Sequence, residues 1–314
     1  MPWDDRVARR LKLRDLHVFK VVAHLGSMGK AATELAVSQP AISKAITDLE
    51  HVLGVRLLDR SRQGVEPTRY GIALLKWSAL VFDNLRQGVD EIDFLADPTA
   101  GELRIGTTEV MTAGLIPAVI NRLSQQFPRI VFSVMQAVDL AQQYRDLRER
   151  NVDLILGRIA EPIADQDMGL EILFEDRLRV VAGINSKWHR RRKIDVAELI
   201  DEPWALPPYD SFIGSLVKDA FLARNLKPPR MTAMSTSLQL YTGLLATGRF
   251  LAVRSASTLR LSGKRPSVKA LPVDLPIQPV HIGIVTLKNR TINPVAQLFI
   301  ECVRKIARPL GKGN

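Results

Sequence analysis

The segment SQPAISKAITDLEHVL, residues 38–53, combines short polar side chains and one lysine at helical spacing. The candidate residues are Ser38, Gln39, Pro40, Ser43, Lys44 and Thr47. Hydroxyl groups and an ammonium at the start of a helix can reach base edges in a DNA major groove, and the free N–H groups there can meet a phosphate. A solvated helix face has a similar composition, so the pattern alone leaves both interpretations open.

Arginines follow this segment in a predicted two-stranded hairpin. Residues 56–60 and 65–67 have the pattern of paired strands with a turn between them. Arg60 and Arg62 at the tip are expected to contact phosphates or a minor groove, which positions a protein on DNA without reading sequence. Thr68 is a further candidate contact and can also cap the helix that follows.

A second group of polar residues follows predicted strands in the C-terminal two thirds of the chain. Short apolar runs at 103–105, 130–135 and 153–156 alternate with helical patterns at 115–127 and 140–150. This alternation predicts an α/β fold of parallel sheets covered by helices, which bind ligands at the carboxyl ends of their strands. The candidates at these strand ends are Thr107, Thr108, Glu109, Gln136 and Arg158.

Two more candidates, Thr236 and Ser237, precede a predicted helix over residues 238–246. A polar helix N-terminus can bind an anion or a hydroxyl group, although N-capping explains such residues, and Thr107, equally well. Arg158 could bind an anion or be an ordinary surface arginine, and its place directly after a buried strand favours the first. As a set, these residues predict a small-molecule site.

Three predicted helices position the first group of residues. The first helix ends at Gly26, where a left-handed residue is expected, and Ser27 can cap the second. After a turn at residues 36–37, Ser38 is predicted to cap the third helix, with a proline in its first turn and Gly54 just beyond its end. Three helices followed by a hairpin form a winged helix-turn-helix.

The stretch GSMGKAATELAVSQPAISKAITDLEHVLGVRLLDRSRQGVEPTRYG resembles the winged helix-turn-helix of LysR-type transcriptional regulators. The shared features are the AA-x-x-L-x-x-SQPA-x-S core and the LE-x-x-LG-x-x-L-x-x-R ending. Leu58 stands where the family usually has phenylalanine, and Pro67 replaces the usual leucine. A volume change in a core and a proline at a strand edge leave the expectation of DNA binding intact. The wording GVEPTRYG is similar to a subgroup that includes regulators of sugar-binding-protein genes.

A long helix is predicted from Thr68 to about Leu95, because apolar residues continue at spacings of three and four. Its predicted seam is Leu75, Ser78, Phe82, Leu85, Val89 and Ile92. This narrow seam favours pairing with a second copy of the chain over packing on its own domain, and it resembles the dimerising linker helix of the LysR family. Two copies would present two recognition helices to a pseudo-palindromic site.

The C-terminal part, with the motifs NVDLILGR and LFEDRLRVVAG, resembles the LysR effector domain, a two-lobed fold similar to periplasmic solute-binding proteins. The domains that the resemblance implies are a winged helix-turn-helix at 11–69, a linker helix at 70–96, a hinge at 97–101 and an effector domain at 102–305. Lobe I is expected at 102–174 and 278–305, and lobe II at 178–271.

The resemblance also implies the partners. These are double-stranded promoter DNA, a small-molecule effector between the lobes, and further copies of the chain in a homodimer and then a homotetramer. The effector is expected to be a sugar or an organic acid, and RNA polymerase is a further candidate partner. The implied effector contacts lie after the first strand, at the end of the second strand, and at the helix start near Thr236 and Ser237.

Composition sets limits on the class of protein. The 314 residues, 46% of them hydrophobic, are enough for two or three domains. The sequence has no run of about 18 apolar residues and no secretory signal, so we expect a cytoplasmic protein without membrane contact. One cysteine and five histidines without ligand spacing predict neither a metal site nor a cofactor.

The net charge of +11 suits a polyanionic partner such as nucleic acid. The first 70 residues contain 12 Lys and Arg against 8 Asp and Glu, so the positive excess is expected to be spread along the chain. The basic run KWHRRRK at 187–193 could be a localisation signal or a nucleic-acid patch. A solvated loop is favoured, because no periodic pattern organises the run.

Two other function classes fit the sequence less well. An enzyme would need a catalytic set, and the candidates contain no Ser-His-Asp or Cys-His set, no metal cluster and no phosphate-binding glycine loop. A solute-binding protein would carry an export signal and would not need a DNA-reading segment. The sequence therefore predicts a sequence-specific regulator that a small molecule modulates.

Overall fold

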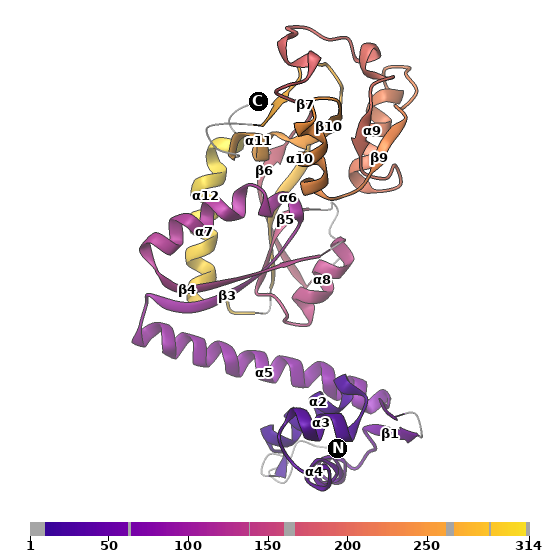
Figure 1. Cartoon of the computed structure of the whole chain (residues 1–314). Coiled ribbons are helices and arrows are strands. Elements are labelled where there is room, and N and C mark those ends of the chain that lie inside the picture. Colours follow the sequence, from indigo (N-terminus) through magenta and orange to yellow (C-terminus); the bar gives the residue numbers. More distant parts are fainter. Residues whose placement is uncertain are drawn as a thin grey trace. The chain divides into compact units, whose positions relative to one another are not determined.

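The computed structural model describes residues 10–61, 64–137, 139–159, 167–261, 267–288 and 290–311. It contains two compact units, Met1–Val89 and Asp90–Asn314, which divide inside the long helix α5 (Arg69–Ala96). Figure 1 labels the helices and strands of both units. Within the described ranges, no helix is long and apolar enough to cross a membrane.

Unit 1 contains three short helices, a two-stranded sheet and the first part of α5. Its other elements are α2 (Leu13–Leu25), α3 (Met28–Glu34), α4 (Gln39–Leu53), β1 (Leu58–Ser61) and β2 (Gly64–Pro67). Apolar residues spaced three and four apart on the helices form one core around Phe19, Ile42 and Ile46, each with 0% exposure. Leu58 also lies in this core, so the smaller residue at this position is packed.

Local capping residues set the ends of these helices, as the sequence predicts. Gly26 ends α2 in the left-handed conformation with φ of 62°, and the Ser27 Oγ accepts a hydrogen bond from the Lys30 N–H in α3. The Gly26 carbonyl accepts a 2.9 Å hydrogen bond from the Val65 N–H, which ties this turn to β2. Gly54 ends α4 with φ of 68°.

The predicted seam of α5 divides into two halves. In the first half, Leu75 and Phe82 pack against the core of unit 1, and Ser78 is buried. In the second half the apolar side chains are exposed, with exposed fractions of 47% for Leu85 and 56% for Val89. The first half therefore packs on its own domain, which is the alternative to a single dimer seam.

The first lobe of unit 2, lobe I, is a mixed sheet with helices on both faces (Figure 1). Its strand order is β4-β3-β5-β12-β6, where β4 is Arg129–Gln136, β3 is Ala100–Thr107, β5 is Leu154–Arg158, β12 is Val280–Leu287 and β6 is Met168–Asp176. Its helices are α6 (Glu109–Thr112), α7 (Leu115–Gln126), α8 (Leu140–Arg148) and α12 (Pro294–Gly311).

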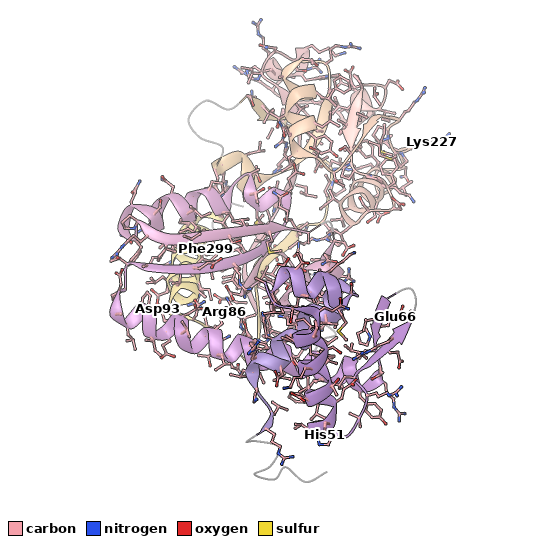
Figure 2. The ribbon with its side chains drawn as sticks, turned by 60° about the horizontal axis from the view of Figure 1, so that its bottom comes forward. His51, Glu66, Arg86, Asp93, Lys227 and Phe299 are labelled. Atoms are coloured by element: carbon pink, nitrogen blue, oxygen red, sulfur yellow. The ribbon has the colours of Figure 1, made fainter. Side chains whose placement is uncertain are left out.

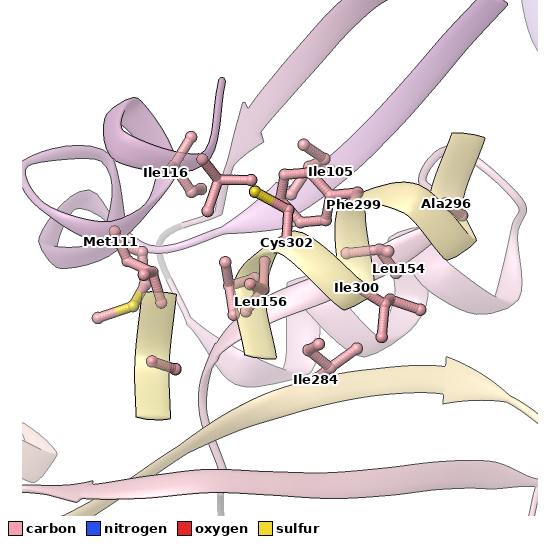
Figure 3. Close-up of a cluster of buried hydrophobic side chains, with 14 of the residues drawn as sticks. Ile105, Met111, Ile116, Leu154, Leu156, Ile284, Ala296, Phe299, Ile300 and Cys302 are labelled. Carbon is pink, nitrogen blue, oxygen red and sulfur yellow. The ribbon is translucent and has the colours of Figure 1, made fainter. Parts of the chain in front are cut away.

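Alternating residues of β5 serve the two faces of this sheet. Leu154 and Leu156 point into the core beneath α7 and α12, whereas Ile155 packs in the smaller cluster under α8. Figure 3 shows the larger cluster, in which Phe299 and Cys302 of α12 lie among the strand residues. Because both faces are covered, the strand reads as a continuous apolar run.

The second lobe, lobe II, has the same layered construction. Its strand order is β11-β7-β10-β8-β9, where β11 is Val268–Ala270, β7 is Leu178–Gly183, β10 is Leu251–Ser255, β8 is Trp204–Leu206 and β9 is Met231–Met234. Its helices are the short 3-10 helices η1 (Lys187–Arg190) and η2 (Val196–Leu199), with α9 (Phe212–Leu222), α10 (Leu238–Ala246) and α11 (Ala256–Leu261). Helix α9 covers one face of the sheet and α10 the other.

Both sheets are mixed, which corrects the prediction of parallel sheets. Strand β12 is antiparallel to β5 and β6, and β7 is antiparallel to β10 and β11. The antiparallel strands flank the two places where the chain changes lobe, between Asp176 and Leu178 and between β11 and β12. At the first crossing the Asp176 carboxylate accepts a 3.0 Å hydrogen bond from the Ser257 N–H, and burial raises the pKa of Asp176.

Candidate nucleic-acid interface and ligand site

Helix α4 presents the polar face that the sequence predicts. The Ser38 Oγ accepts a hydrogen bond from the Ala41 N–H, and Pro40 occupies the first turn, where a missing N–H costs nothing. Ile42, Ile46 and Leu49 fix the rotation of the helix by facing the core. The N-terminal half of the opposite face is consequently held toward solvent.

The candidate residues on α4 lie together on that face. Ser38, Gln39, Pro40, Lys44 and Thr47 are exposed, and Ser43 is half-buried. The Thr47 Oγ1 donates a 2.9 Å hydrogen bond to the Ser43 carbonyl, which leaves its lone pairs directed outward as acceptors. Among the described residues, Lys44 has no ion-pair partner, so its ammonium is available to an external acceptor.

The two hairpin candidates and Thr68 have different surroundings. Arg60 is exposed on β1, opposite Val65 of β2, whereas Arg62 lies outside the described residues. The Thr68 Oγ1 donates to the Arg56 carbonyl at 2.7 Å and accepts from the Gly71 N–H at 3.1 Å. Thr68 therefore joins α5 to the segment before β1 through the hydroxyl that it would offer to DNA.

The sequence analysis missed Glu50, which holds the recognition helix against the hairpin. Its Oε1 accepts hydrogen bonds from the N–H groups of Leu57 at 2.7 Å and Leu58 at 3.2 Å. The acid in the LE-x-x-LG pattern was a signal, but its partners lie seven and eight residues further along. Gly71 is also required, since a Cβ atom there would lie 2.2 Å from the Leu57 carbonyl oxygen.

Thr107 fixes the sheet edge on which the ligand candidates lie. It has 0% exposure, and its Oγ1 donates a 2.7 Å hydrogen bond to the Leu156 carbonyl on β5. The buried Gln143 of α8 donates to the Thr107 carbonyl at 3.2 Å. Because this hydroxyl is inaccessible and already bonded, Thr107 positions its neighbours.

Glu109 links the two lobes. Its Oε1 accepts a 3.0 Å hydrogen bond from the Leu238 N–H, the first N–H of α10 in lobe II. A carboxylate at a helix N-terminus also interacts favourably with the helix dipole. Figure 1 shows α6, which carries Glu109, beside α10. The predicted residues Glu109 and Ser237 are thereby brought together.

Two buried groups lie near the Glu109 carboxylate. Burial lowers the pKa of Arg254 and Glu109 opposes this shift, while burial and Glu109 raise the pKa of Tyr241 to about 12. The Arg254 Nη2 donates to the Thr242 Oγ1 at 2.7 Å and to the Leu238 carbonyl at 3.2 Å. Arg254 was not predicted, since it lies inside an apolar strand with no signal of its own.

Arg158 makes the second contact between the lobes. Its guanidinium carbon lies 3.8 Å from the ring centroid of Phe212, the first residue of α9. Burial lowers the pKa of Arg158, and Tyr144 opposes this shift. Within the described ranges the guanidinium has no hydrogen-bond or ion-pair partner. A desolvated cation stacked on an aromatic ring is suited to an anionic group of a ligand.

The remaining ligand candidates surround these contacts. The Gln136 Nε2 donates to the Thr112 Oγ1 of α6 at 2.9 Å, and a Cβ atom added at Gly157 would lie 3.8 Å from Thr108. Ser237 caps α10, its Oγ accepting from the Leu240 N–H at 3.3 Å, and Thr236 is exposed beside it. In the part of the chain that the structure describes, no cluster of three His, Cys, Asp or Glu residues could hold a metal ion.

Two family models match this chain. The model described as a bacterial regulatory helix-turn-helix protein of the lysR family matches residues 13–72, and the model described as the LysR substrate binding domain matches residues 96–308. The first covers the helices and hairpin of unit 1, and the second covers both lobes.

Relatives of known name align over nearly the whole chain. The HTH-type transcriptional regulator GbpR of Azospirillum brasilense is 28% identical over 298 residues, which cover 94% of this chain and 86% of that protein. The HTH-type transcriptional regulator PcaQ of Agrobacterium fabrum is 26% identical over 311 residues, covering 98% of this chain and 99% of that one.

Solved structures share the fold. A full-length OxyR variant from Pseudomonas aeruginosa has a TM-score of 0.66 at 22% identity, covering 95% of this chain and 97% of that one. The LysR family regulator CbnR has a TM-score of 0.63 at 21% identity, covering 95% of this chain and 99% of that one. CbnR has also been solved in complex with its target DNA.

Proposed function

We propose a residue-level mode of action for this chain, which belongs to the LysR family of transcriptional regulators. It is a DNA-binding transcriptional regulator with an N-terminal winged helix-turn-helix and a C-terminal effector-binding domain. The proposal concerns which residues read DNA, where the effector binds, and how copies of the chain assemble.

The N-terminal half of α4 reads promoter DNA in the major groove. The observation that carries this proposal is the exposed polar face of Ser38, Gln39, Pro40, Lys44 and Thr47 on a helix whose other face is locked in the core. Lys44 and the hydroxyl groups contact base edges, and Arg60 contacts the DNA backbone from the hairpin. Arg62 is proposed for the same role, whereas Thr68 acts mainly by capping α5.

Fluorescence-anisotropy titrations of single variants test this assignment. Lys44→Ala is expected to lower the ratio of affinities for target and random DNA by about tenfold, since a base contact contributes roughly 1–3 kcal/mol of discrimination. Arg60→Ala is expected to weaken binding to both duplexes equally and to reduce the salt slope by about 1. Lys20→Ala, an exposed lysine on α2, is the control for the lost charge. An unchanged affinity ratio for Lys44→Ala would refute the assignment.

The effector binds where the lobes meet, beside Glu109 and Arg158. Thr108, Gln136, Thr236 and Ser237 supply hydroxyl and amide groups there, and Arg158 supplies a cation without an ion-pair partner among the described residues. This chemistry suits a sugar or an organic acid, since hydroxyl groups pair with the first set and a carboxylate with the second. The effector changes DNA binding through its different affinities for two arrangements of the lobes.

Thr108→Val tests the effector site. A panel of sugars and organic acids is screened by thermal unfolding of the full chain, and each compound that stabilises the wild type is then titrated against the variant. We expect the variant to lose the stabilisation and the compound's effect on DNA affinity, while DNA binding without the compound stays unchanged. Thr232→Val on β9 is the matched control. Equal responses of wild type and Thr108→Val would place the site elsewhere.

The chain acts as a homodimer and then a homotetramer. The exposed half of the α5 seam supplies the first contact between copies, and two recognition helices then meet a pseudo-palindromic promoter site. RNA polymerase is the proposed partner at the promoter. The protein works in the cytoplasm, where its DNA target lies, through binding and not through catalysis.

A further inference from the structure

Lobe II carries nearly all of the net positive charge of the protein. Residues 178–271 contain 16 Lys and Arg against six Asp and Glu, an excess of ten within a chain whose net charge is +11. The first 70 residues, which contain the DNA-reading helix, have an excess of only four. The expectation that the charge is spread along the chain is therefore wrong, and lobe II has a strongly positive field.

Most of these cations are on the surface. Of the 14 that lie in described residues, Arg254 is buried and the other 13 are exposed. Lys264 and Arg265 lie outside the described residues. The exposed cations fall into two groups at opposite edges of the sheet, one around η1 and β11 and the other on α9 and the segment before β9.

The group around η1 is held on a fixed support. Trp188 is buried at 7% exposure, and the charged ends of Lys187 and Arg191 lie 5.2 and 5.8 Å from its ring centroid. The Lys269 Nζ on β11 donates a 3.0 Å hydrogen bond to the His189 carbonyl, and Ile194 bridges to the chain near Val273. The run KWHRRRK is thus packed against the edge of the sheet, although the sequence favoured a solvated loop.

Part of this group has no intramolecular counter-ion. Lys187 pairs with Glu202 at 2.6 Å, and Arg191 pairs with Glu198 at 3.0 Å. Arg190, Arg192 and Lys193 are exposed and have no ion-pair partner in the described ranges. We call these three residues the basic edge of lobe II. Three adjacent unpaired cations repel one another, so an external polyanion would be stabilised there.

We propose that the basic edge of lobe II binds the DNA backbone without reading its sequence, as a second nucleic-acid contact beside α4. Lys and Arg without exposed apolar anchors are typical of phosphate contacts, whereas the cores of protein interfaces are depleted of lysine. Trp188 and Ile194, the large apolar residues of this segment, are buried. The inference rests on the proposed DNA-binding function, because unit 1 brings the duplex to the same chain and raises its effective concentration.

Charge-neutralised variants of the full chain test the proposal. The variant carries Arg190→Ala, Arg192→Ala and Lys193→Ala. The control carries Lys218→Ala, Lys227→Ala and Arg230→Ala, which remove the same charge from exposed positions at the other edge of the lobe. Figure 2 shows Lys227 on the outer surface of lobe II. Replacing Arg190 and Arg192 by lysine keeps the charge and checks that any loss is electrostatic.

Each protein is titrated at several salt concentrations against the same target site in two duplexes. One is trimmed to the protected site, and the other has long random flanks. We expect the basic-edge variant to bind the long duplex about tenfold or more weakly, with its salt slope reduced by roughly 2 to 3, since each phosphate contact contributes about 0.9. The trimmed duplex, the control and the lysine variant should be unchanged.

Two outcomes would overturn the proposal. One is wild-type affinity and salt slope of the basic-edge variant on the long duplex, and the other is an equal loss in the control variant, which would indicate bulk charge. If DNA binding were unchanged but transcription with purified RNA polymerase were lost, the basic edge would bind an acidic protein surface instead. Failure of wild-type protein to discriminate the trimmed site would count against the proposed function and not against this inference.

Discussion

At the scale of single residues, the partners of each polar group separate structural roles from ligand-binding roles. The hydroxyls of Thr68 and Thr107 are already bonded to backbone carbonyls of the fold, so a ligand would have to break those hydrogen bonds. Lys44 and Arg158 have no such partners among the described residues, and an external group can bind them without loss. Sequence reasoning grouped all four as candidates because it identifies donors without showing whether they are already used.

Asp153 shows the energetic weight of a fully partnered group. Its carboxylate accepts hydrogen bonds from Arg104 and Arg290 at 2.9 and 2.7 Å. Burial raises the pKa of Asp153, but Arg104 and Arg290 outweigh burial and lower the pKa to about 2. Because the folded pKa lies below the ordinary value of 3.8, the stabilisation is complete above about pH 4 and is lost as the pH falls toward 2.

Asp153→Asn is expected to lower the free energy of unfolding at pH 7 by about 3 kcal/mol, because two buried guanidinium groups lose their counter-ion. The variant should also lose less stability than the wild type between pH 4 and pH 2. Urea unfolding of the full chain at several pH values measures both effects, with Glu102→Gln, an exposed acid on β3, as the control. Parallel pH curves for wild type and Asp153→Asn would contradict this account.

At the scale of elements, α5 is a helix with two different apolar surfaces. Its first half completes the core of unit 1 through Leu74, Leu75 and Phe82. A second stripe stays exposed along the helix at steps of three and four, and it consists of Trp77, Val81, Leu85, Val89 and Ile92. An exposed apolar stripe of this length is typical of a contact between protein chains.

Leu85→Glu together with Val89→Glu is expected to weaken the dimer, because burying two carboxylates in an apolar seam is costly. Sedimentation of the full chain at micromolar concentration should show a shift toward monomer. Asn84→Glu, an exposed polar residue on α5, adds a similar charge outside the stripe and should leave the assembly unchanged. Wild-type sedimentation of the double variant would mean that α5 does not mediate pairing.

Elements whose ends are set locally could be predicted from the sequence. The caps of α4 by Ser38 and Gly54 follow from residues that are adjacent in the chain. The contact between Glu109 and Leu238 joins residues 129 positions apart, and no local pattern indicates such a partner. The antiparallel pairing of β12 was missed for the same reason, since an apolar run does not specify strand direction.

At the scale of the whole molecule, the division of labour follows the two units. Unit 1 carries the exposed reading face, and unit 2 carries two lobes joined by Glu109 and Arg158 contacts. Most of the net positive charge lies in lobe II and not in unit 1. Charge distribution thus separates general attraction to DNA from sequence reading, which depends on hydrogen bonds made by α4.

The central claim is that this protein reads a specific DNA sequence, and one titration tests it most directly. The DNA fragment that the full chain enriches most from sheared genomic DNA is compared with a scrambled duplex of equal length, by fluorescence anisotropy at near-physiological salt. The account predicts an affinity ratio of about a thousandfold or more. Equal affinity for the two duplexes would contradict it, because the charge of lobe II alone would then explain all binding.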